Sequence, residues 1–355
     1  MRDARYVERT EGGWEYGGNA SQRLWEKSAI GRLTDNGKLL LSDAEVIFCR
    51  DHRNIDFPKD SWLHEAVSEN KSLLEEAAVL EALRVPGNKV VLRENCKFFG
   101  FGVSEMTWAM RWSSDTHPSK DGPVSQILFF RSIEAFSVTE LYNWCLQVTN
   151  SGMIAEVIVV DEEQSVVTYR VLISDIRGDL SPPKSEDFLR ISKLHFELTE
   201  SGAFFPNTSL WEFQNMGIPL HGGRQLDLLE IEIIIGLINN NRDISCIGDS
   251  SMSAGLLLDL WNRGLNTRSG FKYGTAWRCY PGDVGDGHAP WLVVDPNSDI
   301  SDNSPKDWAS ACLCSRLASG VNKHWVHPFF DGDTWRYLEL SRPPSDSRWS
   351  NPTRK

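Results

Sequence analysis

The sequence lacks a long hydrophobic run, a secretory signal and a zinc-binding cysteine pattern. The longest apolar run of the 355-residue chain, IEIIIGLI from Ile231, is far shorter than the roughly 18 residues that span a bilayer. The amino terminus has no apolar signal core. Seven cysteines, an odd number without a C-x-x-C pair, argue against a disulfide framework and a zinc ribbon. We therefore expect a cytoplasmic protein with no membrane span.

The charge is predominantly negative. There are 37 Lys and Arg residues against 49 Asp and Glu residues, a net charge of -12 that repels polyanions in bulk. Residues 255–355 carry 12 basic and 11 acidic residues, which leaves 25 basic and 38 acidic residues on residues 1–254. Any contact with nucleic acid must therefore be local. A hydrophobic fraction of 41% and a charged fraction of 24% are typical of a folded globular chain, and its length suggests two or three domains.

The chain contains a degenerate internal repeat. The segment LWEKSAIGRLTDNGKLLLSDAEVIF from Leu24 is similar to LWEFQNMGIPLHGGRQLDLLEIEII from Leu210. Further along, VIVVDEEQSVVTYRV from Val157 and VHPFFDGDTWRYLEL from Val326 both predict a strand, an acidic turn and a strand. This repetition favours two tandem copies of one fold, although two unrelated α/β domains that share a turn pattern are the alternative.

Helices alternate with short strands, so we expect a mixed α/β (α+β) architecture. The copies span about 20–178 and 205–345. The predicted domains are a first repeat over 1–178, a linker over 179–204 that contains Pro182 and Pro183, the amino-terminal part of the second repeat over 205–254, its carboxy-terminal part over 255–345 and a tail over 346–355.

The second copy places three polar residues at the ends of its elements. A helix from Gly255 stops at Gly264. GTAWRCY and APWLVVD then predict neighbouring strands around the loop PGDVGDGH, so Tyr280 and His288 flank one loop. The next helix is expected to begin at Ser304 and Pro305, and Lys323 follows it at the start of a strand.

The run from Asp259 to Asp295 resembles the catalytic core of the archaeal tRNA-splicing endonucleases. The resemblance rests on Arg263-Gly264, Gly270-Phe271-Lys272-Tyr273-Gly274, Arg278-Cys279-Tyr280 and His288-Ala289-Pro290-Trp291-Leu292-Val293. Val321-Asn322-Lys323 is similar to the family's V-R-K pattern, with Asn322 in place of the usual arginine. The resemblance covers about 260–340 well and the first copy weakly.

The resemblance implies the fused form of the enzyme. Each copy would combine a small amino-terminal α/β part with a carboxy-terminal mixed sheet like that of restriction endonucleases. Two chains would form a homodimer that imitates a four-subunit assembly. Aligning the copies places Pro123 opposite His288, Met153 opposite Lys323, and Trp112 or Ser113 opposite Tyr280. The first copy is therefore expected to be structural.

The resemblance also implies a catalytic triad of Tyr280, His288 and Lys323 that needs no metal or other cofactor. It would excise introns from precursor tRNA at bulge-helix-bulge sites, leaving a 2′,3′-cyclic phosphate and a 5′-hydroxyl. A lysine with an ordinary pKa of about 10.4 suits the stabilisation of developing negative charge. The family interpretation usually makes the tyrosine the base and the histidine the acid, but the sequence leaves this division open.

Two further sets of residues follow from the resemblance. Arg316 corresponds to an arginine that stacks on a bulged base, and Arg336 is a candidate for the second face of that stack, with an ordinary surface arginine as the alternative. The turn of Asp161, Glu162 and Glu163 corresponds to an acidic loop that inserts into a basic groove of the partner chain, or is simply a solvated turn.

Other chemistries are weaker alternatives. Cys279 should point to the opposite sheet face from Tyr280, which disfavours a thiol nucleophile. His324 and His327 are three residues apart in a predicted strand and should face opposite sides, which disfavours zinc. Asp295, Asp299 and Asp302 could hold a metal but fit a solvated loop better. The remaining alternative of a different class is a non-catalytic RNA-binding or assembly subunit.

Overall fold

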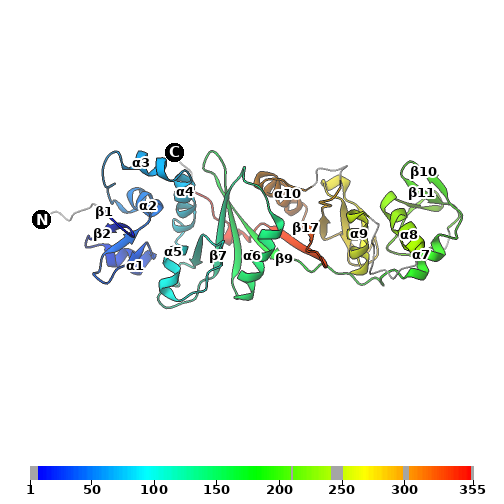
Figure 1. The fold of residues 1–355 in the computed structure, drawn as a ribbon, viewed down its shortest axis with the longest axis horizontal. Helices are drawn as coiled ribbons and strands as arrows, with labels where there is room; N and C mark the ends of the chain where they lie inside the picture. Colours follow the sequence, from blue (N-terminus) through cyan, green and yellow to red (C-terminus); the bar gives the residue numbers. More distant parts are fainter. Residues whose placement is uncertain (1–6, 209–210, 241–250, 299–303, 353–355) are drawn as a thin grey trace. The chain divides into compact units, whose positions relative to one another are not determined.

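The computed structural model describes residues 7–208, 211–240, 251–298 and 304–352 of the chain. The chain forms two compact units (Figure 1). The first unit comprises Met1–Leu172, Asp307–Ala309 and Arg342–Lys355, and the second comprises Ile173–Lys306 and Ser310–Ser341. Each unit contains a small four-stranded sheet, followed by helices and five further paired strands.

The first unit begins with a four-stranded antiparallel sheet of order β1-β2-β4-β3. Its elements are β1 (Val7–Thr10), β2 (Gly13–Tyr16), α1 (Ser21–Ser28), β3 (Arg32–Leu33), β4 (Leu39–Leu41), α2 (Asp43–Arg53), α3 (Trp62–Glu69) and α4 (Leu73–Arg84). Helix α2 begins with a capping box, in which the Ser42 hydroxyl accepts from the Glu45 amide and the Glu45 carboxylate accepts from the Ser42 amide. The apolar sides of α2 and α4 pack into the core of this unit.

Five further paired strands complete the first unit. Its elements are β5 (Lys89–Leu92), α5 (Arg93–Cys96), η1 (Lys97–Phe99), β6 (Ala109–Trp112), β7 (Ser125–Arg131), α6 (Val138–Asn150), β8 (Ile154–Val160) and β9 (Val166–Ile173). The order is β5-β6-β7-β8-β9; only β7 and β8 are parallel, and α6 connects them (Figure 1). Helices α4 and α6 both contact β8.

The strands of the second unit follow the same order as the corresponding strands of the first unit. Its first elements are α7 (Ser185–Ile191), β10 (Glu197–Thr199), β11 (Gly202–Phe205), β12 (Ile218–Leu220), β13 (Gly223–Leu226) and α8 (Leu228–Asn240). The remaining elements are α9 (Met252–Asn262), β14 (Asn266–Ser269), η2 (Phe271–Tyr273), β15 (Trp277–Tyr280), β16 (Trp291–Val293), α10 (Trp308–Gly320), β17 (His324–Phe330), β18 (Trp335–Ser341) and η3 (Ser345–Ser347). The sheet orders are β10-β11-β13-β12 and β14-β15-β16-β17-β18, and only β16 and β17 are parallel.

The two units also share a buried interaction at equivalent positions. Gly31 and Gly217 both adopt the left-handed conformation, with φ of 63° and 68°. Each donates its amide to a buried glutamate at 2.8 Å, Gly31 to Glu45 and Gly217 to Glu230. The second oxygen of each glutamate accepts from the residue three positions earlier, at the start of its own helix. Glycine is required at both positions because other residues are strained at this φ.

The predicted linker over 179–204 differs from the structure. It contains α7 and β10, and β10 pairs with β11 in the second unit. The hairpin that these strands form has a counterpart in the first unit, since the Thr199 hydroxyl donates to the Gly202 carbonyl at 3.2 Å and that of Thr10 donates to the Gly13 carbonyl at 3.1 Å. Strand β10 is exposed throughout, so it has no alternation of apolar residues that could reveal it.

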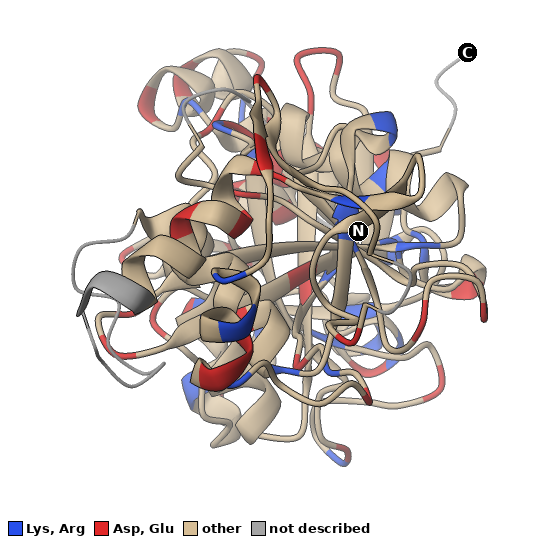
Figure 2. Ribbon diagram, turned by 90° about the vertical axis from the view of Figure 1, so that its right-hand side faces the viewer, with Lys and Arg blue, Asp and Glu red and all other residues tan. Residues whose placement is uncertain are grey.

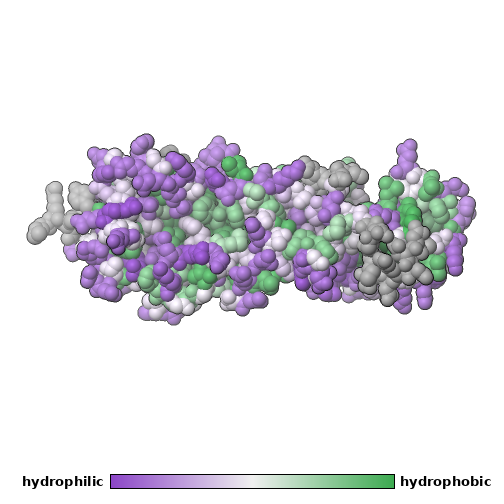
Figure 3. Space-filling model, viewed as in Figure 1, coloured by the Kyte–Doolittle hydropathy of each residue, from purple (hydrophilic) through white to green (hydrophobic). Residues whose placement is uncertain are grey.

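The surface agrees with the charge balance of the sequence. Acidic residues are spread over helices and loops (Figure 2), and hydrophilic side chains cover most of the visible surface, with small hydrophobic areas between them (Figure 3). Within the described residues, none of the helices combines the length and hydropathy needed to cross a membrane.

Candidate active site

Three strands bring the motif residues to one edge of the sheet in the second unit. Tyr280 is the last residue of β15, His288 lies in the loop that leads into β16, and Lys323 directly precedes β17. Strand β15 runs antiparallel to β16, and β16 runs parallel to β17. The end of β15 and the beginnings of β16 and β17 therefore lie at the same edge.

The strand register places Tyr280 and Lys323 in one row across the sheet. Tyr280 follows Cys279, which is opposite Trp291, and Lys323 precedes the β17 residue that is also opposite Trp291. Extending both registers by one residue puts Pro290 between Tyr280 and Lys323. The two residues are thus two strands apart, with about 10 Å between their backbones.

The two side chains also share a face of the sheet. Cys279 and Val326 belong to the buried cluster that includes the apolar residues of α9. Successive strand residues alternate between faces, so Tyr280, next to Cys279, and Lys323, three residues before Val326, both lie on the opposite face. A phenol and an ammonium group can therefore approach each other over Pro290.

His288 joins the site through its neighbour in the chain. The Lys323 ammonium donates a hydrogen bond to the carbonyl of Ala289, the residue after His288. His288 itself is exposed, and its imidazole makes no hydrogen bond or ion pair with any part of the chain that the structure describes. It is free to contact a ligand at this edge.

The surroundings of Lys323 favour an anionic ligand. Its ammonium nitrogen lies 5.6 Å from the centre of the Tyr273 ring, which belongs to η2 in the glycine-flanked turn of the motif. Burial, and after it the nearby positive charge of Arg278, lower the pKa of Lys323 from its ordinary value of 10.5. Among the described residues, no carboxylate forms an ion pair with Lys323. A phosphate group would supply the missing negative charge.

The Arg-Gly pair of the motif is structural. Arg263 forms ion pairs with Asp259 at 2.6 Å and Asp175 at 2.9 Å and stacks on the Tyr337 ring at 4.4 Å. Gly264 packs so tightly that a Cβ would lie 2.6 Å from the Gly178 carbonyl oxygen. This pair fixes the end of α9 against the start of the second unit.

The segment around Gly178 also positions the loop that carries His288. The amide of Asp179 donates to the carbonyl of Pro281, which follows Tyr280, at 2.6 Å. A Cβ on Gly178 would lie 2.6 Å from the same carbonyl oxygen. The predicted linker begins directly after Gly178, and only the fold reveals that this segment supports the site.

Among the described residues of the first unit, the equivalent strand positions do not form such a polar site. Superposing the two sheets by register places Trp112 opposite Tyr280 and Met153 opposite Lys323. It places Gly122 opposite His288, one residue before the Pro123 expected from sequence. Trp112 belongs to a buried apolar cluster, and Met153 packs against that cluster, so apolar residues occupy both positions in the first unit.

The predicted RNA-binding arginines lie at different places. Arg316 is exposed on α10, and no ion pair or hydrogen bond holds it within the described chain. Arg336 lies opposite Phe329, near the far end of β17 from Lys323, and pairs with Asp331 at 2.7 Å. The structure therefore does not bring Arg336 to the edge that carries the triad.

The predicted acidic loop connects β8 and β9 in the first unit. Glu162 and Glu163 are exposed, and the Asp161 carboxylate accepts from the amides of Glu163 at 3.0 Å and Ser165 at 2.7 Å. These bonds shape a tight turn that presents the two glutamates outward. The geometry is compatible with docking and with a solvated turn.

The alternative chemistries find little support. Cys279 is buried in the core, which raises the pKa of its thiol. His324 pairs with Glu339 at 2.8 Å, whereas the imidazole of His327 contacts the Ser304 hydroxyl at 2.7 Å. Within the described ranges, no group of three or more His, Cys, Asp or Glu side chains is arranged to hold a metal ion. Asp295 is buried, and Asp299 and Asp302 lie outside the described residues.

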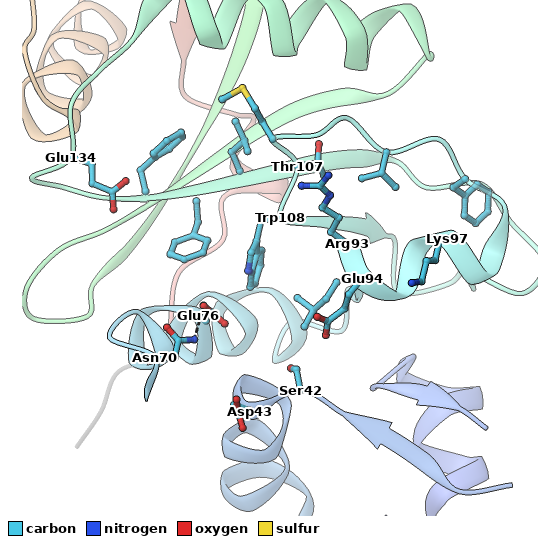
Figure 4. A pocket seen from close by; sticks show the side chains of 17 residues that line it. Ser42, Asp43, Asn70, Glu76, Arg93, Glu94, Lys97, Thr107, Trp108 and Glu134 are labelled. Carbon is cyan, nitrogen blue, oxygen red and sulfur yellow. Dashed lines mark hydrogen bonds between the residues drawn. The ribbon is translucent and has the colours of Figure 1, made fainter. Parts of the chain in front are cut away.

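A pocket of about 1080 Å³ lies in the first unit, lined by parts of α2, α4, α5 and β7 (Figure 4). Its wall contains Asp43, Glu76, Glu94 and Trp108. Burial raises the pKa values of Glu76 and Glu94, and Glu76 accepts a hydrogen bond from Asn70 at 3.1 Å. The pocket contains no residue of the catalytic motif, so the sheet edge of the second unit remains the candidate active site.

Residues 256–337, which include this sheet edge, match the model of the tRNA intron endonuclease catalytic C-terminal domain. These residues contain Tyr280, His288 and Lys323. The comparisons support a tRNA-splicing endonuclease.

Three named relatives, each called a tRNA-splicing endonuclease, are similar to the chain. The protein of Picrophilus torridus is 29% identical over 185 residues, 52% of this chain and 55% of that protein. The protein of Methanococcoides burtonii is 24% identical over 360 residues, 90% of this chain and 96% of that protein. The protein of Thermoplasma volcanium is 27% identical over 184 residues. The similarity thus spans about half the length of two of these relatives and nearly all of the third.

Proposed function

We propose that the protein is a cytoplasmic tRNA-splicing endonuclease that cuts precursor tRNA at bulge-helix-bulge sites without a metal ion. The observation that carries the proposal is the row at the sheet edge of the second unit. Tyr280 and Lys323 share one row and one face there, and Lys323 bonds to the residue after His288. A base, an acid and a cation are the three groups that internal attack by a ribose hydroxyl requires.

The proposed reaction is a transesterification within the RNA. The ribose 2′-oxygen attacks the adjacent phosphorus and gives its proton to the base, while the bond from phosphorus to the 5′-oxygen breaks and the acid protonates that oxygen. The products are a 2′,3′-cyclic phosphate and a 5′-hydroxyl. Tyr280 and His288 share the two proton transfers, and Lys323 faces the negative charge that develops on the phosphate oxygens. DNA lacks the nucleophile and is not cut.

The proposal includes a fused pair of repeats, of which the second is catalytic. Support comes from the identical strand orders in the two units and from the glycine-to-glutamate bond that Gly31 and Gly217 each make at 2.8 Å. Trp112 and Met153 replace the catalytic residues in the first unit, which therefore acts as scaffold. Two chains, docked through Glu162 and Glu163, would present two active sites to the two bulges of one RNA.

A cleavage assay in EDTA tests the proposal. The purified chain is incubated with a bulge-helix-bulge transcript, and the ends of the products are analysed. Cleavage to cyclic phosphate and 5′-hydroxyl ends is expected for the wild type. His288→Ala and Lys323→Ala should each reduce the single-turnover rate by at least about 100-fold while RNA affinity is retained.

The same assay identifies the alternative function. RNA binding without cleavage would indicate a non-catalytic subunit. Cleavage that EDTA abolishes would contradict the metal-free mechanism, and unchanged rates in both variants would remove His288 and Lys323 from the site. A variant of exposed Lys193, whose side chain has no hydrogen bond or ion pair among the described residues, serves as the matched charge control.

A further inference from the structure

Arg278 is a cation at the candidate site, and only part of its hydrogen-bonding capacity is satisfied within the fold. It lies in β15 two residues before Tyr280 and therefore on the same face of the sheet. Its Nε donates to the Ser269 carbonyl at 2.8 Å. Its two terminal nitrogens have no hydrogen-bond partner, and no carboxylate forms an ion pair with it, among the residues the structure describes. Most of its donors remain available to a ligand.

The strand register places Arg278 next to another positive charge, which lowers the stability of the fold. Arg278 is directly opposite Arg268 of the neighbouring strand β14. Like charges at directly opposite positions destabilise a sheet. The positive charge of Arg278 also contributes to lowering the pKa of Lys323, after burial. On this face Arg278 thus lies between Arg268 of β14 and Lys323, which precedes β17, in a chain whose net charge is -12.

The first unit shows what these positions hold when there is no site. The positions of Arg268, Arg278, Tyr280 and Lys323 correspond by register to Val91, Met110, Trp112 and Met153. Val91, Met110 and Trp112 belong to one buried apolar cluster, and Met153 packs against it. The fold therefore accepts apolar residues at every one of these positions. Arg278 differs between the units together with Tyr280 and Lys323, which ties it to the function of the site.

We propose that Arg278 binds the backbone phosphate next to the scissile phosphate of the RNA. Tyr280 and Lys323 occupy the row at the sheet edge, and Arg278 lies two residues further in, about 7 Å along the strand. Its guanidinium offers a planar pair of donors that matches phosphate oxygens. Arg278 would thereby fix the register of the strand so that the scissile phosphate meets Lys323. This inference rests on the proposed function.

The test is a double-mutant cycle between protein and RNA. The RNA carries a 2′-deoxyribose at the cleavage site, which prevents turnover, and a methylphosphonate that removes the charge of one phosphate at a time. Arg278→Gln should bind the unmodified RNA about tenfold more weakly than the wild type. Neutralising the adjacent phosphate should weaken the wild type by about the same factor and leave Arg278→Gln unchanged.

The salt dependence of binding gives a second readout that a structural role would not change. The affinity falls as the salt concentration rises, and Arg278→Gln should make this dependence weaker. The slope of log affinity against log salt should become less negative by about 0.7, as expected for one lost phosphate contact on a single strand. Arg278→Lys should keep the slope, because it keeps the charge. Arg23→Gln is the matched control, since Arg23 is exposed on α1 and its side chain has no hydrogen bond or ion pair within the described chain.

Several results would overturn the proposal. One is that the losses from Arg278→Gln and from phosphate neutralisation add at every phosphate, and another is that Arg278 is coupled only to the scissile phosphate. An unchanged salt slope in Arg278→Gln, or no measurable binding of the RNA by the wild type, would also overturn it. Thermal unfolding of Arg278→Gln and Arg278→Lys verifies that both variants fold. The cleavage assay separates the two hypotheses: a wild type that cleaves without coupling at Arg278 refutes only this inference, whereas a wild type that shows the coupling without cleavage refutes the proposed activity.

Discussion

The buried glutamate of the second unit should make the stability of that unit depend on pH. Among the described residues, no arginine forms an ion pair with Glu230; burial first, and then the charge of Asp227, raise its pKa to about 8, against a smaller opposing effect of Arg268. The native state therefore keeps a proton on Glu230 at pH values where the unfolded chain, with a glutamate pKa of about 4.3, has lost it. Between these two values the unfolded state binds fewer protons, so the free energy of unfolding falls as pH rises.

The size of the effect follows from the same pKa. Each pH unit inside this window removes about 1.4 kcal/mol, so the second unit should lose roughly 2.7 kcal/mol between pH 5 and pH 7. Burial raises the pKa of Asp227 as well, which acts in the same direction. Glu230→Gln cannot ionise and should flatten this dependence.

Glu45 is the matched control in the first unit. It makes the same bond to a glycine amide but also pairs with Arg84 at 2.6 Å, and both side chains are only 2% exposed. Glu45→Gln leaves the Arg84 charge buried without its partner and should cost about 3–5 kcal/mol.

Hydrogen exchange followed by mass spectrometry measures both effects locally. Peptides that cover β12 to α8 report the second unit, and peptides that cover β4 to α2 report the first. A wild-type opening free energy for the second unit that is constant or rises from pH 5 to pH 7 would refute the reasoning. The same slope in Glu230→Gln would also refute it.

Two further predictions concern assembly and RNA recognition. Reversing the charges at 161–163 should weaken dimerisation, because an acidic loop would no longer fit a basic groove; an unaltered sedimentation profile would dismiss the docking hypothesis. Arg316→Ala should reduce affinity for a bulge-containing RNA about tenfold, as expected for the loss of one stacking contact, and should leave affinity for a fully paired duplex unchanged. Equal losses for both RNAs in a binding titration would mean that Arg316 contributes only charge.

Local signals predicted the elements of the site well. Gly264 stops α9 in the left-handed conformation, with φ of 76°, as its place after the helix indicates. The expected start of the next helix at Ser304 and Pro305 differs, since α10 begins at Trp308. The Ser304 hydroxyl contacts the buried imidazole of His327 at 2.7 Å instead of capping the helix. A tertiary contact of this kind leaves no trace in local sequence.

The sequence identifies only those residues of the site that belong to a recognisable motif. Tyr280 and Lys323 stand at strand ends that sequence patterns can locate. The relevance of Arg278 depends on which residues face it across β14, and register is not visible in one sequence. The support that Gly178 gives to Pro281 depends on chain packing between distant segments. From the sequence, Gly178 is recognisable only as a residue next to the predicted linker.

The first unit also indicates what stability the second unit gives up for its site. Met153 occupies the position of the first unit that is equivalent to Lys323, and it packs against the apolar cluster that contains Trp112. Lys323 instead carries a partly buried charge near Arg278. Lys323→Met should therefore stabilise the second unit by about 0.5–2 kcal/mol while abolishing cleavage, as active sites often trade stability for function. His288→Ala is the matched control, because His288 is exposed and its loss should stop cleavage without stabilising the fold. Chemical denaturation of both variants measures the difference. Destabilisation by Lys323→Met would show that the bond from its ammonium to the Ala289 carbonyl outweighs the cost of the charge.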